Sequence, residues 1–460
     1  MARITEYRER LKRDWSGHLA QLTDYLSAQD ILAAAQGYRW RDRIWNPVWT
    51  FWTFLVQVLH TGSSCREAVA LVLAEQAGGS PRRISPDASA YCQARQRLPL
   101  SVFVAALGKV GRCLQNQASL EFLWHGRQVH VVDGSSCSMA DTPSLQAVFG
   151  QPDGQKVGCG FPVVRLVAMF CWATGAVLDV AMGAYRSSEL TLVGPLWDHL
   201  QRADIVLADR FYCTYVVLSE LLTRGCDAVF RLHGGRSRTV DFRKGKRLGH
   251  DDRRMTWDRP TICPRGLSRP QWMSLPEHLP VRVIRFCTAV PGFRSRTIVV
   301  ATTLLDPVAY PREQIAALYG DRWTVELRLR DIKTTMQMDV LRGKSPDVVR
   351  KEILVHLLAY NLIRALMWQA AQKHGRPLHR LSFAGTLAHL NALMPYLWLQ
   401  VGTRRFALLH ALLLEWIARD TLAHRPDRVE PRAVKRRPKE YDLLNKPRQQ
   451  LRQALLRKTG

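Results

Sequence analysis

The chain has ten cysteines but no C-x-x-C pair, and the cysteines are scattered through stretches that predict helices and strands. This pattern argues against a zinc ribbon or a disulfide framework and favours a reducing compartment. The first residues are strongly charged and contain no apolar signal core. The most apolar early run, residues 47–59, is too short to span a bilayer and includes Thr and Gln. We therefore expect a cytoplasmic protein without a membrane segment.

Acidic residues are also scarce. The 460 residues include 66 Lys and Arg against 39 Asp and Glu, which gives a formal net charge of +27. Such an excess indicates a polyanionic partner, and nucleic acid is the first candidate; generic basicity of an arginine-rich genome is the alternative. The length allows two or three domains, and a hydrophobic share of 47% is ordinary for a globular protein.

Two of the few acids stand where apolar strands are expected to end. The run VHVVDG predicts a short strand that ends in Asp133 and a turn glycine, and DIVLADRFY repeats the plan at Asp209. Further strands are expected near 162–171, 176–183 and 227–232, with helices over 189–200 and 213–224. This order predicts a mixed α/β sheet with both acids at strand ends.

A third acid, Glu326, lies in a long helix that is expected to begin near Tyr319 and to run on towards Gly343. At about 100° per residue, Arg322, Glu326 and Lys333 all fall within roughly 60° of Tyr319 on one face.

The rest of this helix supports the same orientation. An apolar flank that would pack into the core is formed by Val325, Leu329, Ile332 and Met336. Arg328 lies about 180° from Tyr319 and is expected to face away from any ligand of the charged face. A solvated stripe of charges is the alternative interpretation of that face. Two acids on strands that face a helical Glu favour a site for two divalent cations in phosphoryl transfer.

The acids and their spacing resemble a known family. The order Asp133, Asp209, Glu326, with Tyr-x-x-Arg-x-x-x-Glu and a Lys seven residues later, is similar to the DDE transposases of the insertion-sequence-four family. The segments DGSSCSMADTP, QPDGQKVGCGFP, LADRFYCTY and ATTLLDPVAY extend the resemblance over roughly residues 129–366. It implies a bacterial, nucleoid-associated cut-and-paste enzyme on an α/β, ribonuclease-H-like mixed sheet.

The resemblance also implies roles for residues and partners. Asp133, Asp209 and Glu326 would coordinate two Mg²⁺ (or Mn²⁺) ions, and Tyr319, Arg322 and Lys333 would grip phosphates at the transposon end. The partners would be double-stranded DNA, both terminal inverted repeats and target DNA, and a second copy of the chain in a homodimeric synaptic complex. A hairpin intermediate is implied in the same way.

Two other functions fit the same residues. A structure-selective nuclease or resolvase could use the same three carboxylates, since these do not choose between hydrolysis and strand transfer. A non-catalytic, transposase-derived DNA-binding protein is the second alternative, although the intact acidic triad counts against it.

The regions around the catalytic core are assigned from composition. We expect a helical N-terminal domain over 1–120 that binds DNA ends or packs as a bundle, and core segments over 121–232 and 306–375. A β-rich insertion is expected over 233–305, of which 233–280 shows no regular pattern, and a helical region with a basic tail over 376–460. Within the insertion, Trp257 and Trp272 could stack on an unpaired base or simply pack.

Overall fold

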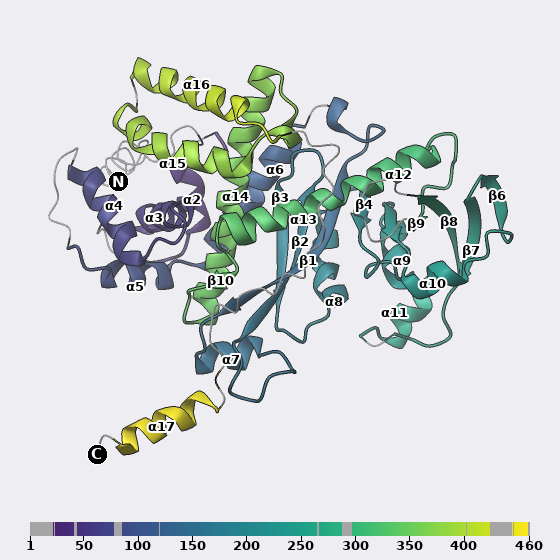
Figure 1. Cartoon of the computed structure of the whole chain (residues 1–460), viewed down its shortest axis with the longest axis horizontal. Helices are drawn as coiled ribbons and strands as arrows, with labels where there is room; N and C mark the ends of the chain where they lie inside the picture. The colour runs from purple at the N-terminus through teal and green to yellow at the C-terminus, as the bar shows by residue number, and fades with distance from the viewer. Residues whose placement is uncertain are drawn as a thin grey trace.

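A computed structural model describes residues 22–458 except 23, 41–43, 78–84, 119, 265, 288–296, 402, 424–443 and 445. In Figure 1 the N-terminal helices lie on the left, the central sheet lies in the middle, and a strand-rich extension lies on the right. The basic tail expected after residue 424 falls mostly outside the described residues.

The central sheet has the ribonuclease-H-like arrangement. Its strands, in the order β3-β2-β1-β4-β5, are β3 (Val177–Gly183), β2 (Val163–Cys171), β1 (Val129–Met139), β4 (Ile205–Ala208) and β5 (Asp227–Arg231). The pairs β1–β2 and β2–β3 are antiparallel, whereas β1–β4 and β4–β5 are parallel. The predicted mixed sheet is therefore confirmed.

The first strand is longer than predicted. β1 continues past Asp133 to Met139, because its second half pairs with β2 and, at Ser138 and Met139, with the short strand β10 (Val340–Leu341). The expectation of a turn at Gly134 is wrong, since Gly134 lies inside the strand opposite Val167.

The two faces of the sheet pack against different helices. Val131 and Leu207 belong to a core shared with α14 (Pro346–His374), whereas Val132 and Ala208 belong to a core shared with α9 (Tyr215–Thr223). This alternation is the period of two expected for a strand. The second face also carries α8 (Glu189–Val193) and the 3-10 helix η3 (Gly194–His199), into which the helix expected over 189–200 is divided at Gly194-Pro195.

The helix α14 is the centre of the molecule. Asn361 at its middle hydrogen-bonds both the N–H and the carbonyl of Val177, 2.8 and 2.7 Å away, which fixes it beneath β3. Its 29 residues are long and apolar enough to cross a membrane, but 89% of the most apolar stretch is buried within the protein. Among the described residues, the bent pair α5 and α6 meets that criterion only when taken together across a 74° break.

The N-terminal region is helical, as predicted. It contains α2 (Ala28–Ala34), α3 (Pro47–Leu59), α4 (Cys65–Ala77), α5 (Ser89–Arg97) and α6 (Leu100–Asn116). The side chain of Asn46 caps α3 by accepting the N–H of Trp49 at 3.0 Å, and Ser64 and Glu67 form a capping box at the start of α4. The buried Lys351 of α14 donates to the carbonyl of Gln96 at 2.7 Å, so α5 is attached directly to the catalytic core.

The insertion is more regular than its sequence suggested. It contains α10 (Gly234–Thr239), β6 (Lys246–Gly249), β7 (Asp252–Asp258), α11 (Arg269–Ser274), β8 (His278–Cys287) and β9 (Thr297–Thr302). The sequence over 233–280 has no helical period, yet this stretch forms two short helices and two strands, and β8 and β9 pair in antiparallel register. β9 pairs with β5, so core and insertion form one continuous sheet in the order β5-β9-β8-β7-β6.

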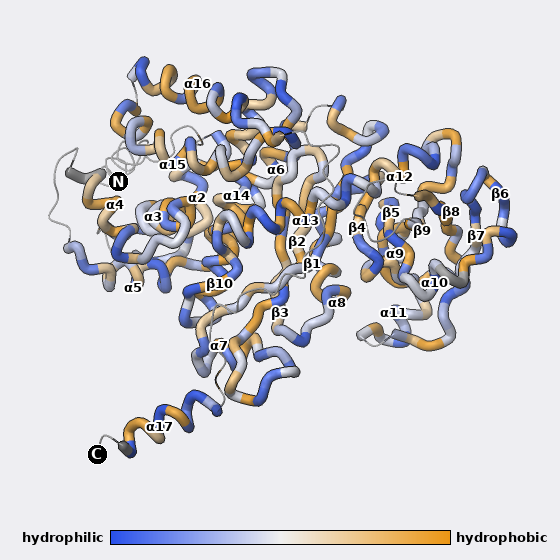
Figure 2. Tube along the Cα trace, in the orientation of Figure 1, coloured by the Kyte–Doolittle hydropathy of each residue, from blue (hydrophilic) through white to orange (hydrophobic). Residues whose placement is uncertain are grey.

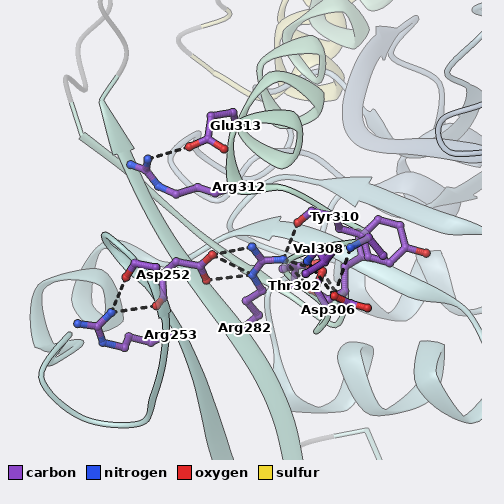
Figure 3. A network of polar contacts seen from close by, with 12 residues as sticks. Asp252, Arg253, Arg282, Thr302, Asp306, Val308, Tyr310, Arg312 and Glu313 are labelled. Carbon is purple, nitrogen blue, oxygen red and sulfur yellow. Dashed lines mark hydrogen bonds and ion pairs between the residues drawn. The ribbon is translucent and has the colours of Figure 1, made fainter.

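A buried arginine connects the insertion to the chain segment that leads into α12 (Arg312–Asp321). Arg282 on β8 is fully buried, pairs with Asp252 on β7 at 2.5 Å, and donates to the carbonyls of Leu304, Asp306 and Tyr310 (Figure 3). Because a buried charge is stable only when its hydrogen bonds are made, this network fixes the path of residues 304–310.

The C-terminal region adds helices α15 (Phe383–Leu399), α16 (Arg404–Arg419) and α17 (Arg448–Lys458). The first two pack above α14, whereas α17 extends away from the body (Figure 1). Figure 2 shows hydrophobic residues concentrated in the central strands and α14, and hydrophilic residues around β6.

Candidate active site

The segment that carries Tyr319, Arg322, Glu326 and Lys333, called the signature segment below, forms two α-helices followed by a π-helical turn. These are α12 (Arg312–Asp321), α13 (Trp323–Arg330) and a π-helical turn, η4 (Asp331–Thr335). The helix therefore begins at Arg312, after Pro311, and ends before β10 rather than near Gly343. Gln337 adopts a positive φ of 57°, which turns the chain back towards β1. The expected helix limits were wrong at both ends: Pro311 sets the start at Arg312, seven residues before Tyr319, and the pairing of β10 with β1 sets the end.

The predicted apolar flank packs as expected. Val325, Ile332 and Met336 are buried in the core shared with α14, and Leu329 packs against it. Tyr319, which was expected to point at a phosphate, is only 6% exposed, and burial raises the pKa of its phenol to about 12. Its ring lies 5.9 Å from the guanidinium of Arg322. In this structure Tyr319 therefore supports Arg322 from beneath.

The fold brings the two strand acids side by side. Val132 of β1 pairs with Ala208 of β4 in parallel register, so Asp133 and Asp209 follow at neighbouring positions. Asp133 shares the face of Val131, which is the face that α13 covers with Val325. The sequence placed both acids at strand ends, and the register makes them neighbours.

Arg322 links the third acid to the first. Its Nη2 lies 2.8 Å from Glu326 Oε1, and its Nη1 lies 4.0 Å from Asp133 Oδ2. The Arg322 side chain is only 13% exposed, so this pairing takes place in a region largely shielded from water. Asp133, Glu326 and the Arg322 guanidinium between them thus form one cluster.

The electrostatics of Asp133 reflect this crowding. The pKa of Asp133 is raised to about 7, chiefly by burial; Arg322 and the N–H of Gly134 lower it, and the charges of Asp209 and Glu326 raise it. The charges of the other two acids therefore reach Asp133, as expected for acids that lie in one region of the protein.

The donor set suits a hard divalent cation. Three carboxylates supply oxygen ligands, which Mg²⁺ and Mn²⁺ prefer. Among the residues that the structure describes, however, no group of three or more His, Cys, Asp or Glu is closed around one point. In this conformation Arg322 contacts both Glu326 and Asp133. The three carboxylates therefore fit a divalent cation by their chemistry, but they do not surround one point in this structure.

Lys333 lies beside the same strand as Asp133. Its Nζ donates to the carbonyl of Ser136 at 2.8 Å and lies 3.5 Å from Asp339. Because the π-helical turn contains Lys333, its direction no longer follows 100° per residue, and its side chain is only 15% exposed.

Arg328 faces away from the acids, as the helical geometry predicted, but it does not face solvent. Its guanidinium donates to the carbonyls of Cys171 and Trp172, at 3.2 and 3.0 Å. Arg328 therefore holds the helix against the end of β2.

The two tryptophans of the insertion have different surroundings. Trp272 is 2% exposed and packs against Tyr215, so in this conformation its indole is not accessible to a base. Packing, which the sequence left open as the alternative to base stacking, therefore accounts for the position of Trp272. Trp257 is half-buried beneath the guanidinium of Arg236, 5.0 Å from the ring centre, and its role in stacking stays a prediction.

Sequence reasoning missed two residues near the acids. Glu189 seemed only to open a helix, and Tyr212 only to follow Asp209, yet the Tyr212 hydroxyl donates to Glu189 at 3.3 Å. The spacing DRFY places Tyr212 three residues after Asp209, but nothing in the sequence pairs it with a residue 23 positions earlier.

Comparison with known proteins agrees with the geometry. Residues 124–362 match the transposase DDE domain family. The chain is 26% identical over 362 residues to the transposase InsG for insertion sequence element IS4 of Escherichia coli, covering 77% of each chain. It is 37% identical over 65 residues to the Escherichia coli transposase for insertion sequence element IS421, covering 14% of this chain and 18% of that one. A piggyBac transposase synaptic complex with hairpin DNA aligns with a TM-score of 0.47 at 8% identity, covering 88% of this chain and 84% of the other.

Proposed function

Because the chain belongs to the DDE-domain transposases, which cleave and transfer DNA with the help of metal ions, we propose that Asp133, Asp209 and Glu326 are its catalytic metal ligands. The observation that carries the proposal is the convergence of the three acids, with Arg322 bonded to one and near another. When bound, two Mg²⁺ or Mn²⁺ ions would activate the attacking oxygen and stabilise the leaving 3′ oxygen.

The other residues of the signature act on the DNA. Arg322 leaves Glu326 to contact a phosphate at the transposon end, and buried Tyr319 holds its guanidinium in position. Lys333 exchanges the carbonyl of Ser136 for a phosphate oxygen, a stronger, charge-assisted hydrogen bond. Catalysis then depends on positioning and on charge neutralisation.

The assembly and reaction course complete the proposal. The substrates are terminal inverted repeats and target DNA, and two copies of the chain hold two ends in a synaptic complex. Excision passes through a hairpin at the transposon end, and the enzyme works on the bacterial nucleoid in the cytoplasm. Residues 1–120 and the insertion over 233–305 contact DNA on either side of the core. The exposed cations Lys246 and Arg247 of the insertion support this placement.

The test is a cleavage and strand-transfer assay with a labelled element end, Mg²⁺ and a target plasmid. Asp133→Asn, Asp209→Asn and Glu326→Gln should each abolish cleavage and leave end binding near wild type, because phosphate contacts do not require the metal ligands. Retained cleavage by any of the three would remove that residue from the catalytic set.

Control variants are available at exposed acids on neighbouring elements. Glu313→Gln, on an exposed side chain of α12, and Asp198→Asn, on an exposed side chain of η3, should cleave like wild type. If the wild-type protein cleaves DNA but does not transfer strands, it is a nuclease. If it shifts the labelled DNA in a gel but yields neither cleaved nor transferred DNA, it is a DNA-binding protein.

A further inference from the structure

Glu189, at the first turn of α8, presses its carboxylate against the strand that carries Asp133. A Cβ atom placed on Gly134 would lie 2.4 Å from the Glu189 carboxyl carbon, closer than two such atoms can approach. The carboxylate therefore fills the space that any larger residue at position 134 would need. This contact, and not a turn, explains the glycine after Asp133.

The contact lies behind the acids. Side chains alternate along β1, so position 134 shares the face of Val132, which packs on the α8 and α9 side of the sheet. Asp133 points to the opposite face, towards α13. Glu189 thus supports β1 from the back at the residue next to Asp133.

The same carboxylate is tied to the segment that carries Asp209. Its Oε2 accepts the hydroxyl of Tyr212, which is fully buried and lies three residues after Asp209. Its Oε1 lies 3.8 Å from Arg165 on β2. One side chain therefore contacts the backbone beside the first acid and a fixed tyrosine beside the second.

The charges support a functional connection. Burial raises the pKa of Glu189, and the charge of Asp209 adds to this rise. Burial also raises the pKa of Tyr212, as do the charges of Glu189, Asp133 and Asp209, so Tyr212 remains a hydroxyl donor. Glu189 and the strand acids are therefore within electrostatic range of one another.

We propose that Glu189 is a positioning residue of the divalent-cation site, which sets the separation of the Asp133 and Asp209 carboxylates through Gly134 and Tyr212. It also adds a negative charge behind them, which attracts cations. The inference rests on the proposed function, because it requires that Asp133 and Asp209 bind the metal. Outer partners of metal ligands are worth roughly 10–100-fold in metal affinity, and we expect an effect of that size here.

The experiment is a Mn²⁺ titration of the full chain without DNA, with free Mn²⁺ measured by electron paramagnetic resonance. Glu189→Ala and Glu189→Gln should weaken Mn²⁺ binding by roughly 10–100-fold. Tyr212→Phe should weaken it less, and combining it with Glu189→Ala should add little, because both changes break the same hydrogen bond. The half-saturating Mg²⁺ concentration for cleavage should rise in the same order.

The control is Glu220→Ala. Glu220 is also half-buried with a raised pKa, but it lies near the far end of α9, which runs back from Asp209 towards the start of β5. Glu220→Ala should bind Mn²⁺ like wild type, and melting temperatures in chelator should show that all variants fold.

Three outcomes would overturn the inference. In the first, Glu189→Gln and Glu189→Ala bind Mn²⁺ like wild type while Asp133→Asn does not; this would leave the proposed function intact. In the second, Glu220→Ala weakens binding equally, which would indicate a general loss of stability. In the third, wild type fails to bind Mn²⁺, which would overturn the proposed metal ligands as well. A Glu189-dependent Mn²⁺ site in a protein that transfers no DNA would uphold the inference and reject only the proposed reaction.

Discussion

The fold makes the ionisation of Asp133 costly. Its carboxyl ionises near pH 3.8 when unperturbed and near pH 7 in the metal-free folded protein, chiefly because of burial. Between these values the folded state keeps a proton that the unfolded state has lost. The free energy of unfolding therefore falls as the pH rises from about 4 to 7 and then stays level.

This linkage predicts a pH-dependent gain for Asp133→Asn, whose amide carries no charge at any pH. In chelator, the variant should be more stable than wild type by roughly 2–4 kcal/mol at pH 8, and the difference should shrink as the pH falls towards 4. Urea unfolding at several pH values measures it. A constant difference across this range would mean that Asp133 does not titrate there.

Lys333 allows a prediction about reaction steps. Lys333→Ala leaves the acids in place but removes the proposed hold on a phosphate, and a small misplacement of the strand can cost about 100-fold in rate. We expect slow nicking and a stronger defect in the later hairpin and transfer products, measured in one time course. Lys373→Ala, at the exposed end of α14, is the control, and an equal defect there would argue against a specific role for Lys333.

At this scale the sequence predicted which side chains carry the chemistry better than where they point. Asp133, Asp209 and Glu326 could be chosen because strand ends and helical spacing are local properties. The burial of Tyr319 and the bond of Lys333 to Ser136 depend on how α13 lies against β1, which no local pattern specifies. Glu189 could not be found at all, because its partners come from three other elements.

At the scale of the elements, Arg328 holds α13 against the end of β2. The sequence predicted only that this side chain would face away from any ligand of the charged face. Arg328→Ala removes two buried hydrogen bonds to the carbonyls at the end of β2, each of a kind worth about 1.5–3 kcal/mol. We expect a lower melting temperature together with reduced cleavage, and partial recovery with Arg328→Lys. Thermal unfolding checks this.

The neighbouring Arg330 is exposed and provides the matched control. Arg330→Ala should leave the melting temperature near wild type. If both variants melt alike, the contacts of Arg328 contribute nothing to stability.

Helices with strong end signals were predicted well, and elements fixed by distant partners were not. Asn46 and Ser64 cap helices in the region that was predicted to be helical, and a cap is a local hydrogen bond. The signature helix ends early because β10 pairs with β1, about 200 residues away in the sequence. β6 and β7 escaped prediction for the same reason, since their strand character comes from pairing along the edge of an existing sheet.

At the scale of the whole molecule, the net charge of +27 predicts salt-sensitive DNA binding. Lys and Arg release counterions from the phosphates that they neutralise, so about 6–10 contacts would weaken end binding by about 10³–10⁵ between 50 and 200 mM salt. Fluorescence anisotropy with a labelled element end measures the slope. A flat profile would place the basic excess away from the DNA.

The continuity of the sheet across β5 and β9 has a mechanical consequence. A pull on the outer strands is transmitted through backbone hydrogen bonds to β5 and β4, and so to the loop that carries Asp209. Arg282 provides a second route, from β8 to the start of the signature segment. Tension in bent DNA, if the insertion holds it as proposed, would therefore be transmitted to the loop that carries Asp209. By the same reasoning, an enzyme trimmed of residues 233–305 would lose both routes and expose an unpaired edge at β5, so the insertion cannot be removed as a separate module.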